Sequence, residues 1–151
     1  MEFIQKLIAS RDRTLPLFDL MEPMLNQTYQ TGKWPVKVLL HHITDTETVY
    51  YDRIRRVLSE PGQVQWAFNQ DAWASGLRYA QRPLALSRDL FGAIRACVIH
   101  EAEMHYESEA AARQFVHSEG GIRTLKSEFD RIVRHNEHHL AQIERALLHT
   151  V

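Results

Sequence analysis

Apolar residues recur every three to four positions along four long stretches of this chain of 151 residues. That spacing is typical of amphipathic helices that bury one face, and no stretch shows the period-two alternation of a half-buried strand. The stretches begin near Phe3, Pro35, Leu84 and Thr124. The sequence therefore predicts an all-α fold, a four-helix bundle, that forms a single domain over residues 1–151.

Prolines and glycines set the expected ends of the first two helices. Pro16 and Pro23 each remove an internal hydrogen bond from the first stretch, so we expect a kink or a break near one of them. Gly32 then ends this segment. Pro35 suits the first turn of the second helix, where its missing donor costs nothing, and that helix should run to about Leu58.

A long connection joins the second and third helices. Residues 61–83 are too many for a tight turn, and we expect a crossover with a short helix that starts near Asp71 as its cap. The segment FVHSEGG is expected to be a loop before the last helix. The third helix is predicted to bury one row of side chains, in which the lone cysteine is a small hydrophobe. This row is Leu86, Leu90, Ile94, Cys97 and Met104.

The composition narrows the range of partners. The chain has 18 basic and 19 acidic residues, a formal net charge of −1, so no strong field would attract nucleic acid or a membrane surface. A single cysteine excludes an intrachain disulfide, and the first residues lack the basic-then-apolar order of a signal peptide. No apolar run is long enough to span a bilayer. We expect a cytoplasmic protein that binds neither nucleic acid nor membrane.

Five of the nine histidines lie in two motifs of helical periodicity. His135 and His139 are four residues apart, so their side chains leave one helix face close together. The apolar stripe of the second helix includes His42 and leaves His41 among charged residues, and the last helix likewise turns His139 inward and His138 outward. We predict that His42, His135 and His139 bind one metal ion and that the other two are surface histidines.

Three neutral imidazoles would hold zinc and leave a fourth position open, as in catalytic zinc sites. Nitrogen ligands do not select one late first-row metal, so zinc or nickel is expected first, with iron, manganese and copper as alternatives. Asp45 is a candidate acceptor for a ligand imidazole or an exposed partner of His41, and Gln142 is a second candidate acceptor. No glutamate directly follows His135, which excludes the His-Glu-x-x-His metalloprotease motif.

Three segments, KWPVKVLLHHITDTE, NQDAWA and HNEHHLAQI, resemble the DinB-like metalloproteins, also called the DinB/YfiT group. The family's His-x-x-Asp-x-Glu run corresponds to His42, Asp45 and Glu47, and its His-x-x-x-His pair to His135 and His139. The resemblance covers most of the chain. It implies a four-helix bundle with a long connection between the second and third helices, often a homodimer, that binds zinc, nickel or a similar ion.

Some proteins similar to this family are transferases or isomerases in which a metal activates the sulfur of a thiol such as bacillithiol, mycothiol or glutathione. We therefore expect a metal-dependent enzyme that acts on a small molecule through an activated low-molecular-weight thiol. One alternative is a hydrolase that uses metal-bound hydroxide, with Glu128 or Asp71 as base. Another is a non-catalytic, metal-stabilised dimeric interaction protein. The sequence assigns no catalytic residue.

Overall fold

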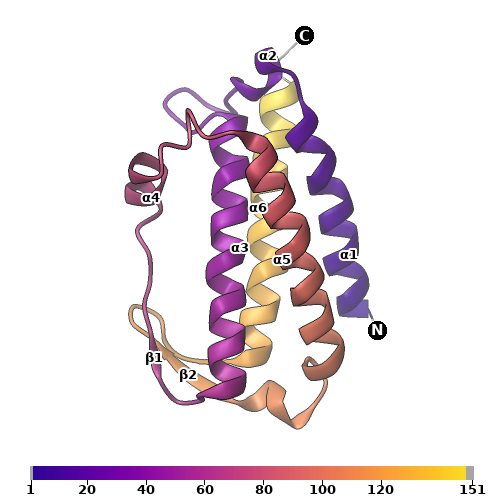
Figure 1. Cartoon of the computed structure of the whole chain (residues 1–151), viewed down its shortest axis with the longest axis vertical. Coiled ribbons are helices and arrows are strands. Elements are labelled where there is room, and N and C mark those ends of the chain that lie inside the picture. The colour runs from indigo at the N-terminus through magenta and orange to yellow at the C-terminus, as the bar shows by residue number, and fades with distance from the viewer. Residues whose placement is uncertain (1, 149–151) are drawn as a thin grey trace.

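Four long helices run alongside one another in the computed structural model, which describes residues 2–148 (Figure 1). The predicted domain's residues 1 and 149–151 lie outside the described residues. α3 packs against α5 and α6, and α1 packs against the same two helices. The predicted all-α four-helix bundle is confirmed. These helices are α1 (Glu2–Thr14), α3 (Val36–Ser59), α5 (Leu84–His105) and α6 (Leu125–Leu148). Within residues 2–148, no helix has both the length and the apolar character needed to cross a bilayer.

The first predicted helix is broken at both of its prolines. α1 ends at Thr14, a 3-10 turn η1 (Leu15–Asp19) follows, and α2 (Glu22–Leu25) completes the segment. Pro16 and Pro23 lie in the first turns of η1 and α2, where a missing N–H group is tolerated. Each proline therefore starts a new short element, whereas the sequence predicted one interruption.

The second helix starts and ends close to the predicted positions. Pro35 is the N-cap residue, and α3 begins at Val36 and ends at Ser59. Gly62, with a positive φ of 84°, then turns the chain back along the bundle, a conformation that glycine adopts without strain.

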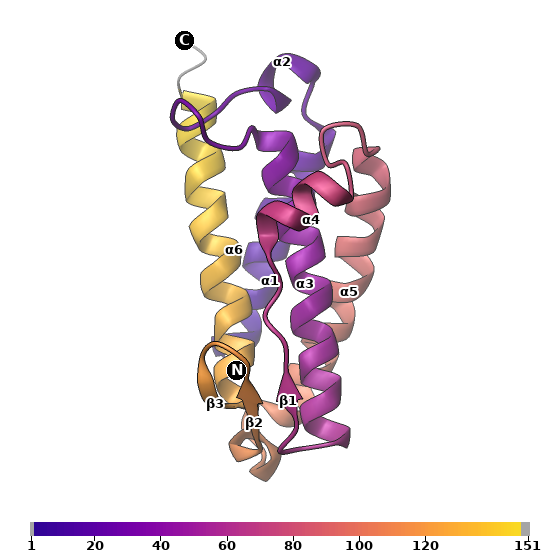
Figure 2. The same ribbon diagram turned by 90° about the vertical axis from the view of Figure 1, so that its left-hand side faces the viewer.

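The crossover contains the predicted short helix and also a strand. β1 (Val64–Gln65) is followed by α4 (Gln70–Gly76). The cap of α4 is Asn69, whose side chain accepts a hydrogen bond from the Ala72 N–H at 2.9 Å, so the expected cap at Asp71 is corrected by two residues. Figure 2 shows the connection rising between α3 and α6, with α4 lying across the upper half of α3.

A small sheet replaces the loop expected before the last helix. A 3-10 turn, η2 (Glu109–Ala112), leads from α5 into β2 (Gln114–His117). β2 pairs in parallel with β1 and antiparallel with β3 (Gly121–Thr124). The sheet lies at the end of the bundle where α3 stops and α6 begins (Figure 2). Strands of two to four residues are too short to show an alternating pattern, which explains why the sequence did not predict them.

The apolar core divides into two clusters along the bundle. On each long helix, a buried polar residue lies between positions that belong to the two clusters: Ser10 on α1, Glu47 on α3, Arg95 on α5 and Asn136 on α6. A layer of buried polar side chains therefore crosses the middle of the bundle. The histidine cluster lies at this level.

The predicted buried row of α5 is wrong at three of its five positions, whereas Leu90 and Ile94 are half-buried and Ile94 packs against the core. Leu86 and Met104 are 60% and 59% exposed, and Cys97 is exposed as well. The buried face instead carries Ser87, Phe91, Arg95, Val98, Ile99 and Ala102. Ser87 and Arg95 interrupt the apolar residues of this face, and the sequence does not show that His41 and Glu47 on α3 satisfy them.

Candidate metal centre

His42 on α3 and His135 and His139 on α6 converge on one point. The Nε2 atom of His135 lies 3.0 Å from that of His42 and 3.1 Å from that of His139. One ring nitrogen from each residue falls within 4.8 Å of the other two. The structure thus brings together the three predicted ligands, although His42 and His135 are 93 residues apart in sequence.

The chemistry of these imidazoles suits a divalent cation. Burial is the main cause that lowers the pKa of His42 to about 3, of His135 to about 2 and of His139 to about 4. All three rings are therefore neutral at physiological pH and offer lone pairs. Two nitrogens that each lie about 2.0 to 2.1 Å from a tetrahedral ion would be about 3.3 Å apart. The Nε2 atom of His135 lies at a similar distance, 3.0 and 3.1 Å, from those of His42 and His139.

Gln142 sets the tautomer of one ring. His139 Nδ1 lies 2.7 Å from Gln142 Oε1, and an amide oxygen can only accept, so the proton is on Nδ1 and the Nε2 lone pair is free. The Gln142 amide nitrogen in turn donates to the Tyr29 hydroxyl at 3.2 Å. The sequence prediction that Gln142 supports His139 is confirmed, and His138 is exposed as predicted.

Aromatic rings enclose the other two imidazoles. The ring centroids of Trp34 and Phe68 lie 5.2 and 6.4 Å from that of His42. Tyr50 meets His135 edge-on at 5.8 Å. These contacts limit water around the cluster and are the source of the burial that keeps the rings neutral.

His41 is not the surface histidine that the sequence predicted. Its side chain is fully buried, with Nδ1 2.7 Å from the Ser87 hydroxyl and Nε2 3.1 Å from the Arg82 carbonyl. Burial lowers its pKa to about 4. The helix pattern placed it on a charged face, but α5 and the chain leading into it cover that face.

Asp45 has neither of the roles expected for it. It accepts hydrogen bonds from the Tyr79 hydroxyl at 2.6 Å and from Arg82 Nη1 at 3.1 Å, and it is 5% exposed. It therefore neither orients a ligand imidazole nor pairs with His41. Its partners tie the end of the crossover to α3.

Glu47, the last residue of the family-like run, holds helices together. Arg95 Nη2 donates to Glu47 Oε2 at 3.0 Å, and Arg95 Nε donates to the other carboxylate oxygen. Arg95 Nη1 also donates to the Leu7 carbonyl and the Ser10 hydroxyl. This buried ion pair links α3, α5 and α1 in the polar layer.

A cavity of about 490 Å³ opens onto the histidines. Its lining includes Tyr29, Lys33, Trp34, Gln70, Asp71, His135, His138, His139 and Gln142. Asp71, at the start of α4, places a carboxylate in this cavity. The other base candidate from the sequence, Glu128, is fully buried and bound to Arg53 at 3.1 Å, so it is not available as a base at the histidines.

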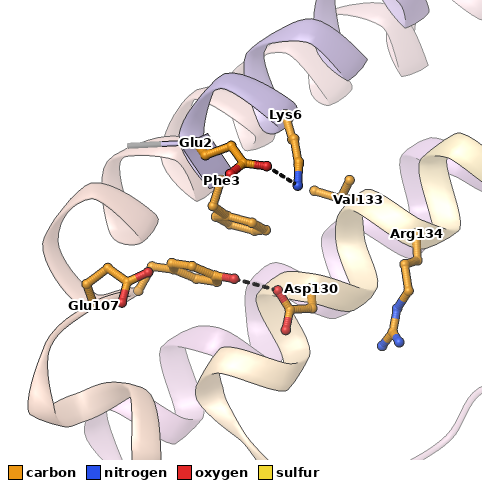
Figure 3. A pocket seen from close by; sticks show the side chains of 8 residues that line it. Glu2, Phe3, Lys6, Glu107, Asp130, Val133 and Arg134 are labelled. Carbon is orange, nitrogen blue, oxygen red and sulfur yellow. Dashed lines mark hydrogen bonds and ion pairs between the residues drawn. The ribbon is translucent and has the colours of Figure 1, made fainter.

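A second hollow of about 430 Å³ lies between α1, the end of α5 and α6 (Figure 3). Two internal interactions occupy its polar groups: Glu2 with Lys6 at 2.7 Å, and the Tyr106 hydroxyl with Asp130 at 2.7 Å. Arg134 also lines this hollow. Its lining contains no histidine or cysteine, so it offers no comparable metal site.

Comparison with known proteins agrees with this geometry. The model of the DinB superfamily matches residues 6–143. The chain belongs to the DinB superfamily. Among relatives of this DinB chain, a protein of Oceanobacillus iheyensis named "Putative metal-dependent hydrolase" is 29% identical over 85% of the chain and 73% of the relative. A relative of the same name from Halalkalibacterium halodurans is 28% identical over 87% of the chain and 75% of the relative.

Solved structures share the DinB fold. YfiT from Bacillus subtilis, described as "a probable metal-dependent hydrolase with an unusual four-helix bundle topology", superposes with a TM-score of 0.86 at 21% identity, over 98% of the chain and 85% of YfiT. The mycothiol-dependent maleylpyruvate isomerase gives a TM-score of 0.71 at 11% identity, over 94% of the chain and 59% of that longer protein. At these identities the likeness concerns the fold.

Proposed function

We propose that this DinB chain is a metal-dependent enzyme that acts on a small molecule through a low-molecular-weight thiol. His42, His135 and His139 would hold a divalent ion, zinc or nickel first. When bound, such an ion supplies a Lewis acid that favours the thiolate form of a thiol at neutral pH. The thiol and its substrate would enter through the cavity beneath α4.

One observation carries this proposal: three neutral imidazoles converge beside a cavity, and in the described part of the chain no carboxylate or thiol joins them. Within residues 2–148, the group of possible metal ligands holds these three histidines and no cysteine, aspartate or glutamate. Three neutral ligands leave the full charge of a divalent ion uncompensated, which favours an anionic ligand such as a thiolate at the open position. An open position also argues against a purely structural metal site.

The chain's own residues would prepare this site. Gln142 keeps the proton of His139 on Nδ1, so that Nε2 faces the cluster. Trp34 and Phe68 shield His42 from water. Asp71 in the cavity could accept a proton from an incoming group.

Hydrolysis is the second candidate, and Asp71 is the observation that favours it. A carboxylate that lines the same cavity as His135 and His139 is suited to act as a general base for water. The names of the relatives from Oceanobacillus and Halalkalibacterium point in the same direction. Hydrolysis would need no thiol, which separates the two candidates by experiment.

The test is an activity screen on zinc- and nickel-loaded protein. Thiols (glutathione, bacillithiol, mycothiol) are combined with an aryl halide electrophile, and thioether formation is followed by chromatography. We expect turnover with a thiol in the wild type and its loss in His139→Ala. His100→Ala, which removes an exposed histidine of α5, serves as the matched control and should keep the activity.

Parallel reactions with activated esters and no thiol test hydrolysis. Ester cleavage that needs the metal, disappears in Asp71→Asn and does not respond to any thiol would reject the thiol proposal in favour of the hydrolase. Absence of bound metal after mild purification and zinc addition would reject both.

A further inference from the structure

Unpaired polar atoms gather where α3 and α6 meet the small sheet. Within residues 2–148, five buried side-chain nitrogen or oxygen atoms lack a hydrogen-bond partner. All five belong to one group of neighbouring residues: Arg53 Nε, Gln65 Oε1, Arg123 Nε, Glu128 Oε2 and Arg131 Nε. Buried polar groups are nearly always paired, so this concentration points to a binding partner at this position.

Three arginines surround a single carboxylate. Glu128 Oε1 lies 3.1 Å from Arg53 Nη1, and Glu128 Oε2 lies 3.8 Å from Arg123 Nη1 and 3.9 Å from Arg131 Nε. Three positive charges thus face one negative charge, which leaves an excess of two positive charges. We call Arg53, Arg123 and Arg131 around Glu128 the arginine cluster.

No neighbour neutralises this excess. Within residues 2–148, the three arginines form ion pairs with Glu128 and with no other acid. His117 is buried beside them, and its pKa is lowered to about 4 by burial and by Arg123, so it remains uncharged. Glu128 offsets one of the three positive charges, and the remaining two repel one another, so a second anion at the cluster would be stabilised.

Gly120 makes room for one of the guanidinium groups. A Cβ atom added at Gly120 would overlap Arg123 Nη2 and lie 2.9 Å from Arg123 Cζ. The backbone of Gly120 does not have the positive φ that favours glycine, so the reason for glycine here is steric. An alanine at this position would displace the Arg123 guanidinium from the cluster.

The arginine cluster adjoins the metal centre. Arg131 and Glu128 precede His135 by one and two turns on the same face of α6, that is, by about 6 and 10 Å along the helix axis. Tyr50 lies between the two sites: its ring is 5.8 Å from the His135 ring, and Arg53 Cζ lies 5.8 Å from the Tyr50 ring.

Solvent reaches the cluster from one side. The Arg131 side chain is 38% exposed, against 13% for Arg123 and 6% for Arg53. Arg53 and Gln65 also line a cavity of about 530 Å³ under the crossover, and Phe68, which packs near His42, lines the same cavity. A small anionic molecule in this cavity could therefore contact Arg53 of the cluster and Phe68 beside His42.

We propose that the arginine cluster binds a carboxylate group of the small thiol that reacts at the histidines. Guanidinium groups donate paired hydrogen bonds to a carboxylate and are the usual recognition group for one. A thiol with a carboxylate about 6 to 10 Å from its sulfur would span both sites. The identity of the molecule as a thiol rests on the proposed function, whereas the binding of a carboxylate at the cluster does not.

The first test measures succinate binding to zinc-loaded protein by calorimetry. We expect saturable binding to the wild type and binding about tenfold or more weaker in Arg131→Gln, as for the loss of one charge-assisted hydrogen bond. Gly120→Ala should weaken binding through Arg123. Arg134→Gln, which removes an exposed arginine of the same helix at the hollow of Figure 3, should leave binding unchanged.

The second test uses cobalt-loaded protein, whose absorption spectrum reports a thiolate bound to the metal. Glutathione carries two carboxylates, and its diethyl ester carries none. We expect glutathione to bind more tightly than the ester in the wild type, and this preference to disappear in Arg131→Gln.

The outcomes separate the two proposals. If glutathione and its ester give the same thiolate band and the same affinity in all variants, the carboxylate site is overturned and the thiol function stands. If succinate binds in a manner that depends on Arg131 and Gly120 but no thiol reaches the metal, the carboxylate site stands and the thiol function fails. Absence of succinate binding, with only water found among the arginines, overturns the carboxylate site.

Discussion

Glu47→Gln should strongly destabilise the fold without removing the metal. The substitution keeps the shape of the side chain but leaves the guanidinium of Arg95, which is fully buried, without a counter-charge. Of the two oxygen acceptors that Glu47 offers, one becomes an amide nitrogen that faces an Arg95 donor. The Leu7 carbonyl and the Ser10 hydroxyl pair only with Nη1 and cannot replace the lost charge.

The expected magnitude follows from the cost of leaving one member of a buried ion pair alone. That cost is about 3–5 kcal/mol in the free energy of unfolding, a large part of the ~5–15 kcal/mol available to a typical domain. The melting temperature should fall by roughly 6–20 °C, at about 2–4 °C per kcal/mol for a chain of this size. The double variant Glu47→Leu/Arg95→Met should recover most of the loss.

The assay is urea unfolding followed by far-ultraviolet circular dichroism, with zinc at the same saturating concentration for every variant, since bound metal raises apparent stability. Asp52→Asn on the same helix is the matched control. Its ion pairs with Arg55 and Arg56 are about half exposed, so it should cost less than about 1 kcal/mol. A loss of less than about 1 kcal/mol in Glu47→Gln, or a loss of zinc at unchanged stability, would refute the structural role of Glu47.

Two further predictions concern the metal centre and the sheet. Gln142→Leu removes the acceptor of the His139 Nδ1 proton and should weaken zinc binding about 10- to 100-fold in a chelator competition assay; unchanged affinity would contradict this role. His117 has a pKa of about 4 in the folded chain against the usual 6.5, so the unfolded chain binds more protons between these values. Stability should therefore fall as pH drops from 6.5 to 4, by up to about 3 kcal/mol from this residue, and His117→Gln should flatten that slope in urea unfolding at stepped pH.

Periodicity predicted the features that depend on repetition over several turns. The four long helices and the inward positions of His42 and His139 follow from apolar residues that recur every three to four positions. The pairing of His135 with His139 needs only the geometry of one helix. Such a pattern predicts which residues are buried in the folded chain, because each helix must bury one face.

Polar residues in buried positions were the main errors of the sequence interpretation. His41 and Asp45 have charged neighbours in sequence, yet both are buried because Ser87, Tyr79 and Arg82 satisfy their hydrogen bonds from other elements. The buried face of α5 was missed for the same reason, since Arg95 occupies its centre. Burial of a polar group depends on partners distant in sequence, which periodicity does not report.

By itself, the sequence determined the helical bundle, an interruption of its first helix near a proline, and the three histidines that face its interior. Only the tertiary structure decided that these histidines meet at 3.0 to 3.1 Å, that Glu47 is held by Arg95, and that Arg53, Arg123 and Arg131 surround Glu128. The physical reason is that a helix's own repeat determines which side chains face inward, whereas the packing of one helix against another determines which of those side chains meet.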